Sequence, residues 1–204
     1  MSLISRSLGV ALSVFCISQP VLAALDEMGI DLDAAYSATR VIESAGSRLE
    51  LRENRAPGRY RMEFDAAGET LIYVMREAEN EAYMLLPSVR IAMAVPSLQV
   101  RELSADVNVL EREEMGRETI NGHEATRYRG KFRDPRGGVG EGYYWVTDEG
   151  IPVRIDMTYE DADVGSVKVL MELQDLQVGA QDPALFAVPD DYQTMSGMGG
   201  FPAR

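Results

Sequence analysis

Apolar and charged residues alternate with a period of two in several segments, and this pattern restricts the backbone more firmly than any other feature. The clearest run is 59–65. Because successive side chains of a strand point to opposite faces, such a run predicts one face toward a core and one toward solvent. The predicted core side holds Tyr60, Met62 and Phe64, and the predicted solvent side holds Arg59, Arg61 and Glu63.

Two further segments, 70–75 and 89–95, are apolar on both faces. In the first of them, one face holds Leu71, Tyr73 and Met75 and the other holds Ile72 and Val74. Strands of this kind have cover on both faces, for example a sheet on one side and a helix on the other. Either both faces are covered, or one face lines an apolar cavity. Segment 96–106 is either the covering helix or a loop, and its pattern leaves both alternatives open.

Turn residues separate the remaining runs. Asn121-Gly122 predicts a tight hairpin, and Asp182-Pro183 predicts the N-cap and first residue of one helical turn. The many short runs predict a mostly β protein. We expect a single curved antiparallel sheet of about ten strands with little helix, and a helix on its concave side would enclose an apolar space.

Residues 1–23 have the pattern of a secretory signal peptide, with a basic start, a short apolar run at 8–17 and small residues before Ala24. Cleavage after Ala23 would release the protein into the periplasm. The alternative is a retained membrane anchor, but the apolar run is shorter than the roughly 20 residues that cross a bilayer. We therefore expect no integral membrane segment after signal removal.

The remaining chain divides into three parts by composition. We expect a lead-in segment at 24–35, one mostly β domain at 36–193 and a disordered tail at 194–204, where Gly and Met dominate. A net charge of −13 argues against nucleic acid as a partner, because the acidic protein surface and the phosphate backbone would repel each other. The single cysteine, Cys16, lies in the predicted signal, which excludes disulfides and thiolate chemistry from the exported protein.

No motif for enzymatic chemistry is present in the sequence. The single histidine, His123, follows the Asn121-Gly122 turn and has no second imidazole or thiol with which to form a zinc site. No Gly-x-Ser-x-Gly motif and no glycine-rich phosphate loop followed by a helix occurs. We predict a protein that is not an enzyme, with no cofactor and no metal site.

Methionines are frequent in the predicted strands. Soft thioethers bind copper(I) in some proteins, but strand methionines more often form adaptable core or the wall of a pocket for flexible ligands. We favour the second interpretation. The residues predicted to line an apolar cavity are Tyr60, Met62, Phe64, Tyr73, Met75, Leu85, Met93, Trp145, Ile155 and Met157.

Several segments together resemble a known family. They are 82–87 with 91–93, 116–128, 145–147, 150–154 and 182–189. In this order they resemble a bacterial periplasmic family of unknown function that is similar in fold to the lipoprotein carrier LolA and to the amino-terminal domain of the envelope-stress regulator RseB. The resemblance covers roughly 36–195. It implies a single curved antiparallel sheet, an open half-barrel of about 10–11 strands, with one or a few short helices on its concave side. In the carriers, the hollow of the half-barrel holds acyl chains.

Two functions follow as expectations. The first is a periplasmic binding protein or carrier for a lipid, a lipoprotein or another apolar ligand, because pockets for such ligands are lined by apolar side chains. The second is an RseB-like module that senses or binds an envelope protein, with a hollow filled by core side chains. The carriers use an arginine inside the hollow to latch a lid, and no counterpart of it can be placed in this sequence.

Overall fold

The computed structural model describes residues 27–95, 108–134, 137–161 and 165–195. The predicted signal peptide, segment 96–106 and residues 196–204 of the predicted tail lie outside the described residues.

The described residues form twelve strands and one 3-10 helix. The bounds are β1 (Tyr36–Ser44), β2 (Ser47–Ala56), β3 (Arg59–Ala66), β4 (Glu69–Arg76), β5 (Glu81–Leu86), β6 (Ile91–Val95), β7 (Asn108–Ile120), β8 (His123–Arg133), β9 (Val139–Val146), β10 (Pro152–Asp161), β11 (Gly165–Val178), η1 (Pro183–Phe186) and β12 (Gln193–Met195).

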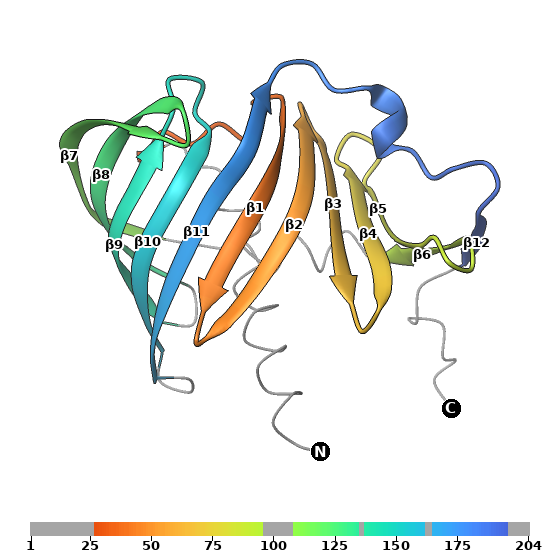
Figure 1. Cartoon of the computed structure of the whole chain (residues 1–204), viewed down its shortest axis with the longest axis horizontal. Coiled ribbons are helices and arrows are strands. Elements are labelled where there is room, and N and C mark those ends of the chain that lie inside the picture. The colour runs from red at the N-terminus through yellow and green to blue at the C-terminus, as the bar shows by residue number, and fades with distance from the viewer. Residues whose placement is uncertain (1–26, 96–107, 135–136, 162–164, 196–204) are drawn as a thin grey trace. The chain divides into compact units, whose positions relative to one another are not determined.

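All twelve strands belong to one sheet, in the order β12-β6-β5-β4-β3-β2-β1-β11-β10-β9-β8-β7 (Figure 1). The pairs from β2–β3 to β5–β6 and from β7–β8 to β10–β11 are antiparallel, whereas β12 runs parallel to β6. The sheet is open, because β12 and β7 are its two ends. This confirms the prediction of a single, mostly antiparallel open sheet.

The chain divides into two compact units that are described separately below. The first unit comprises the described parts of 1–32, 40–50 and 100–175. The second unit comprises the described parts of 33–39, 51–99 and 176–204.

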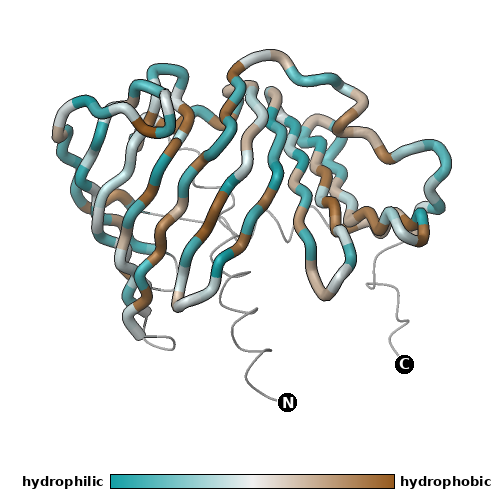
Figure 2. The backbone as a smooth tube through the Cα atoms, viewed as in Figure 1, coloured by the Kyte–Doolittle hydropathy of each residue, from teal (hydrophilic) through white to brown (hydrophobic). Residues whose placement is uncertain are grey.

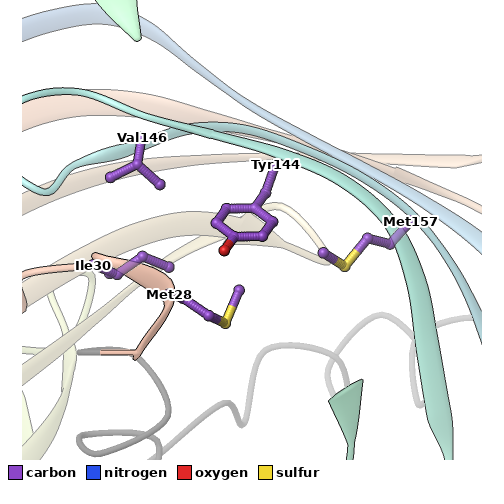
Figure 3. Packing of buried hydrophobic residues seen from close by; sticks show 5 residues of the cluster. All are labelled: Met28, Ile30, Tyr144, Val146 and Met157. Atoms are coloured by element: carbon purple, nitrogen blue, oxygen red, sulfur yellow. The ribbon is translucent and has the colours of Figure 1, made fainter. Parts of the chain in front are cut away.

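The core of the first unit joins the lead-in segment to strands β9 and β10. Met28 and Ile30 pack against three strand residues, Tyr144, Val146 and Met157, and all five side chains are buried (Figure 3). The backbone N–H of Asp31 donates to the carbonyl of Gly150 at 2.9 Å. A Cβ at Gly150 would lie 2.6 Å from the Cβ of Asp31, so only glycine allows this close approach.

The core of the second unit lies between the sheet and the C-terminal segment. Phe186, at the end of η1, packs against Ile72 and Val74 of β4, together with Leu85 and Ala92. Asp182 caps η1, since its side chain accepts a hydrogen bond from the backbone N–H of Ala184 at 2.9 Å. The predicted helical turn is thereby confirmed.

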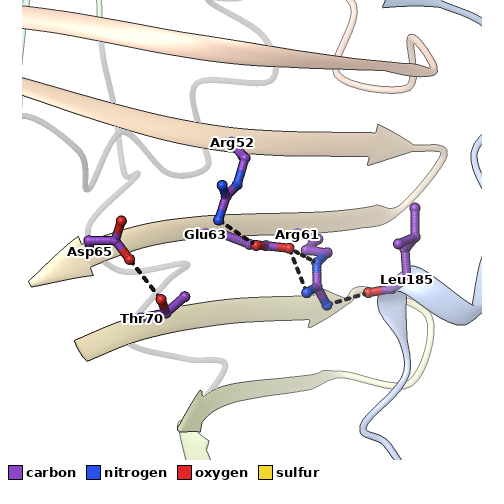
Figure 4. Close-up of polar contacts among 6 residues, drawn as sticks. All are labelled: Arg52, Arg61, Glu63, Asp65, Thr70 and Leu185. Carbon is purple, nitrogen blue, oxygen red and sulfur yellow. Dashed lines mark hydrogen bonds and ion pairs between the residues drawn. The ribbon is translucent and has the colours of Figure 1, made fainter. Parts of the chain in front are cut away.

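The C-terminal segment also corrects the predicted exposure of β3. The Nη1 atom of Arg61 donates to the carbonyl of Leu185 at 3.0 Å, and Glu63 pairs with both Arg61 and Arg52 (Figure 4). The side chains of Arg61 and Glu63 are only 14% and 22% exposed. The prediction that they face solvent is wrong, because Arg61 contacts a segment more than 100 residues away in sequence and Glu63 pairs with Arg61.

One turn and the last strand complete the comparison with the sequence. Asn121 and Gly122 both have positive φ, 49° and 87°, as a tight hairpin turn requires, so the predicted hairpin between β7 and β8 is confirmed. Thr194 and Met195, predicted to belong to a disordered tail, instead lie in β12 and pair with β6.

Candidate apolar binding face

The second unit has one sheet face that is apolar and only partly buried. We call it the methionine face and define it as the side of β3–β6 and β12 opposite to Phe186. Strand register assigns it the apolar residues Tyr60, Met62, Phe64, Leu71, Tyr73, Met75, Ala82, Met84, Leu86, Ile91, Met93, Val95 and Met195. The hydropathy-coloured backbone is hydrophobic along β6 (Figure 2).

The two faces of these strands differ in burial. On the side of Phe186, Val74, Leu85 and Ala92 are at most 1% exposed. On the methionine face Ala82 is 2% exposed, Met195 is 47% exposed, and the other side chains are of intermediate exposure. The methionine face therefore keeps apolar surface that a ligand could remove from water.

A buried carboxylate adjoins the methionine face. Glu53 of β2 lies opposite Met62 in register and is 1% exposed. It accepts hydrogen bonds from the hydroxyl groups of Tyr36 at 2.8 Å and Tyr60 at 3.3 Å. Because a buried carboxylate is costly without hydrogen bonds, these tyrosines stabilise Glu53 and in turn hold the ring of Tyr60 in place.

Six of the ten predicted lining residues come together on the methionine face. They are Tyr60, Met62, Phe64, Tyr73, Met75 and Met93. The sequence pattern placed Leu71 on the same face as Tyr73 and Met75, although Leu71 was not among the predicted lining residues. Sequence reasoning missed Ala82, Met84, Leu86, Ile91, Val95 and Met195 as members of this face. The period-two pattern held the signal for all of these except Met195, whose position depends on a parallel pairing between distant segments.

Leu85 was predicted to line the cavity and does not belong to the methionine face. It lies opposite Ile72 in register and packs beneath Phe186. Because β5 is apolar on both faces, alternation alone could not decide which face was covered.

Trp145, Ile155 and Met157 lie in the first unit, and they do not share one face. Ile155 and Met157 lie on the side of Tyr144, and Met157 is part of the filled core cluster. Trp145 points to the opposite side, where its Nε1 donates to a carboxylate oxygen of Glu118 at 2.9 Å. Trp145 therefore cannot line the same cavity as Met157.

The environment of Trp145 is a layer of cations and carboxylates. The guanidinium carbons of Arg127 and Arg154 lie 5.4 and 5.2 Å from the Trp145 ring centroid, within cation–π range. The hydrogen bond from Trp145, followed by that from Arg127, lowers the pKa of Glu118. This arrangement is a stabilised sheet surface that leaves no apolar wall open.

An arginine closes the filled face of the first unit. The Nε of Arg112 donates to the hydroxyl of Tyr144 at 3.1 Å, and its guanidinium stacks 4.1 Å from the ring centroid of Tyr128. Burial raises the pKa of Tyr144, and the bond from Arg112 only partly opposes this. Tyr144 stays neutral at physiological pH and acts as core.

The first unit also has a polar pocket of about 300 Å³, formed by residues of β7, β8 and β9. Its lining is Glu111, Arg112, Glu113, Arg129, Gly130, Lys131 and Glu141. Glu141 pairs with Arg129 and Lys131, each at 3.1 Å, and these cations, Lys131 foremost, lower its pKa. Such a lining does not suit an apolar ligand. Within the described ranges, no three His, Cys, Asp or Glu residues gather as a metal site.

A membrane-crossing helix, sufficiently long and apolar, does not occur among the residues that the structure describes.

Comparison with known proteins supports the fold. A crystal structure of an uncharacterised conserved protein from Thermus thermophilus is 16% identical, aligns over 92% of this chain and 99% of its own, and has a TM-score of 0.53. This likeness shows a shared fold and nothing of function. No protein-family model and no curated protein matches this chain.

Weaker structural matches include a LolA superfamily protein and the MucA/MucB complex. A LolA superfamily protein from Nitrosomonas europaea is 11% identical over 84% of this chain and 97% of its own, with a TM-score of 0.41. The matched chain in the MucA/MucB complex of Pseudomonas aeruginosa is 13% identical. The alignment covers 85% of this chain and 62% of the matched chain, with a TM-score of 0.42. These lower scores carry no argument about activity or ligand.

Proposed function

We propose that this protein binds a lipid, a lipoprotein acyl chain or a similar apolar ligand on the methionine face, as a periplasmic binding protein or carrier. The observation that supports this proposal most directly is the contrast in burial between the two faces of β3–β6. One is sealed by Phe186, and the other keeps methionine and aromatic side chains partly exposed. The proposed location in the periplasm rests on the signal-peptide pattern of 1–23.

The chemistry of the methionine face suits a flexible chain. Each methylene that leaves water contributes about 0.8 kcal/mol, so a long acyl chain needs only an apolar surface that follows its shape. Methionine has an unbranched, flexible side chain and adapts to irregular partners. The tyrosines Tyr60 and Tyr73, with ring centroids 6.4 Å apart, add rigid apolar area beside the methionines.

The first experiment is a fluorescence titration with cis-parinaric acid, a fatty acid whose emission rises in an apolar environment. We expect the wild type to bind and Met75→Glu to bind about tenfold more weakly or worse, since a carboxylate would be desolvated against the acyl chain. Met115→Glu is the matched control, because Met115 is exposed and lies in the first unit.

Two outcomes of this titration would contradict the proposal that the methionine face binds an apolar ligand. If Met75→Glu binds the fatty acid as the wild type does, the methionine face is not the site. If the folded wild type binds none, the apolar-ligand proposal fails.

A second candidate function is recognition of an envelope protein, and β7 favours it. This strand is an end of the sheet, is 13 residues long and is exposed along almost its whole length. An extended partner segment can add to such an edge through main-chain hydrogen bonds. The filled core of the first unit agrees with a module that binds no ligand there. Failure of cis-parinaric acid to bind the wild type would favour this function.

A further inference from the structure

A cross-strand row of methionines runs over the methionine face. In register, Met62 of β3 lies beside Tyr73 of β4, and Tyr73 lies beside Met84 of β5. Met84 is paired with Met93 of β6, and Met93 is paired with Met195 of β12. Three thioethers therefore occupy directly adjacent positions on one face of three neighbouring strands.

Met195, the third of these thioethers, is positioned by specific contacts of the C-terminal segment. The backbone N–H of Gln193 donates to the carbonyl of Arg90 at 2.8 Å, and Arg90 pairs with Asp191 at 3.4 Å. Tyr192 packs against the core of the second unit. These contacts bring Met195 from a distant part of the sequence to the side of Met93.

Adjacent thioethers have a distinct chemistry. Directly opposed residues of an antiparallel pair, such as Met84 and Met93, have Cβ atoms about 4.5–5.5 Å apart. Neighbouring strands in general, including the parallel pair β6 and β12, lie about 4.7–4.9 Å apart. The methionine side chain is long and flexible enough for neighbouring sulfurs to converge. Thioether sulfur is a soft ligand that prefers soft monovalent ions over hard cations. We propose that Met84, Met93 and Met195 form a binding site for one soft monovalent metal ion, Cu(I) or Ag(I).

Other methionines on the same face lack this arrangement. Met75 is paired with Tyr60 and Ala82, and Met62 has Tyr73 and Glu53 as its register neighbours. The three-sulfur set is therefore specific to β5, β6 and β12. The net charge of −13 raises the local concentration of cations around the protein and favours their approach.

The test measures silver binding by the full-length chain. The two methods are isothermal titration calorimetry in chloride-free buffer and native mass spectrometry. All samples carry Cys16→Ser, because Cys16 is the only thiol in the sequence. We expect one Ag(I) per chain. We expect Met93→Leu to weaken binding by about tenfold or more, since loss of even a supporting group at metal sites has effects of that size. The variant with Leu at 84, 93 and 195 should bind no ion.

Leucine is the chosen substitution because it nearly conserves volume and apolarity while removing sulfur. The Leu variants should therefore keep cis-parinaric acid binding, and Met75→Glu should keep silver binding. The metal proposal and the apolar-ligand proposal thus fail separately. Met115→Leu is the matched control, because Met115 and Met195 are equally exposed, at 47%.

Dependence on pH provides a second measurement. A thioether has no proton to lose, whereas histidine and carboxylate ligands must be deprotonated. We expect silver affinity to stay unchanged between about pH 7 and pH 5, below the usual pKa of histidine. Absence of stoichiometric binding by the wild type, equal binding by the triple Leu variant, or a loss of affinity on acidification would each overturn the proposal.

Discussion

Each of the two units has an apolar sheet face that must be covered, and the two units cover it in different ways. In the first unit, Met28 and Ile30 pack onto the face that holds Tyr144, and the result is a filled cluster. In the second unit, Phe186 seals one face, while the opposite face keeps partly exposed methionines. The difference is that the first unit fills this face with core side chains, whereas the second unit keeps partly exposed apolar surface.

The comparison also separates two uses of aromatic and methionine residues. Tyr144 and Met157 are almost fully buried members of one filled cluster. Tyr73 and Met84, by contrast, are only partly buried side chains in register on an accessible face. Residue type alone does not reveal which role applies, because flexible apolar side chains serve both.

The largest expected effect comes from the sealed face of the second unit. Phe186→Ala should reduce the free energy of unfolding by about 3–5 kcal/mol, because it leaves a cavity among buried side chains. Phe64→Ala, on the partly exposed methionine face, should cost about 1 kcal/mol. Urea denaturation of both variants measures the difference. Equal losses would contradict the contrast between the two faces.

A somewhat smaller effect is expected in the first unit. Met28→Ala should lower the free energy of unfolding by about 2 kcal/mol, since it removes a buried side chain from the cluster. Thermal unfolding followed by circular dichroism is the measurement, and Met115→Ala is the exposed control. A Met28 variant as stable as the control would show that the lead-in segment is not part of the core.

The smallest effect concerns the charged side of the first unit. The pKa of Glu118 is lowered in the folded protein, so its contribution is present above the unfolded carboxyl pKa, near 4.3. The contribution is lost as pH falls through the lower folded pKa. We expect the melting temperature of the wild type to fall toward that of Glu118→Gln as pH is reduced from about 5 to 3. A difference that stays constant over this range would contradict the role of the charge.

Local sequence pattern was sufficient for much of the fold and for part of the candidate site. Alternation in 59–65 placed Tyr60, Met62 and Phe64 together, because the side-chain period of a strand is two. The Asn121-Gly122 turn and the Asp182 cap were also predictable, since each depends on residues within a few positions.

The errors arose where distant segments meet. Arg61 has the pattern of a solvent-facing residue, but Leu185 accepts a hydrogen bond from it. Leu85 and Met84 alternate on an apolar strand, and only the position of Phe186 decides which of them is buried. Met195 had no local signal at all, because its neighbour Met93 belongs to a strand about a hundred residues earlier.

The sequence by itself determined that this chain forms one open, mostly antiparallel sheet and which residues share a face along each strand. Those properties follow from the backbone period and from turn chemistry, which are local. The tertiary structure alone decided which face is sealed and which stays accessible. That choice depends on where the lead-in and C-terminal segments pack, and the energy of burying Met28 or Phe186 comes from contacts with residues far away in the chain.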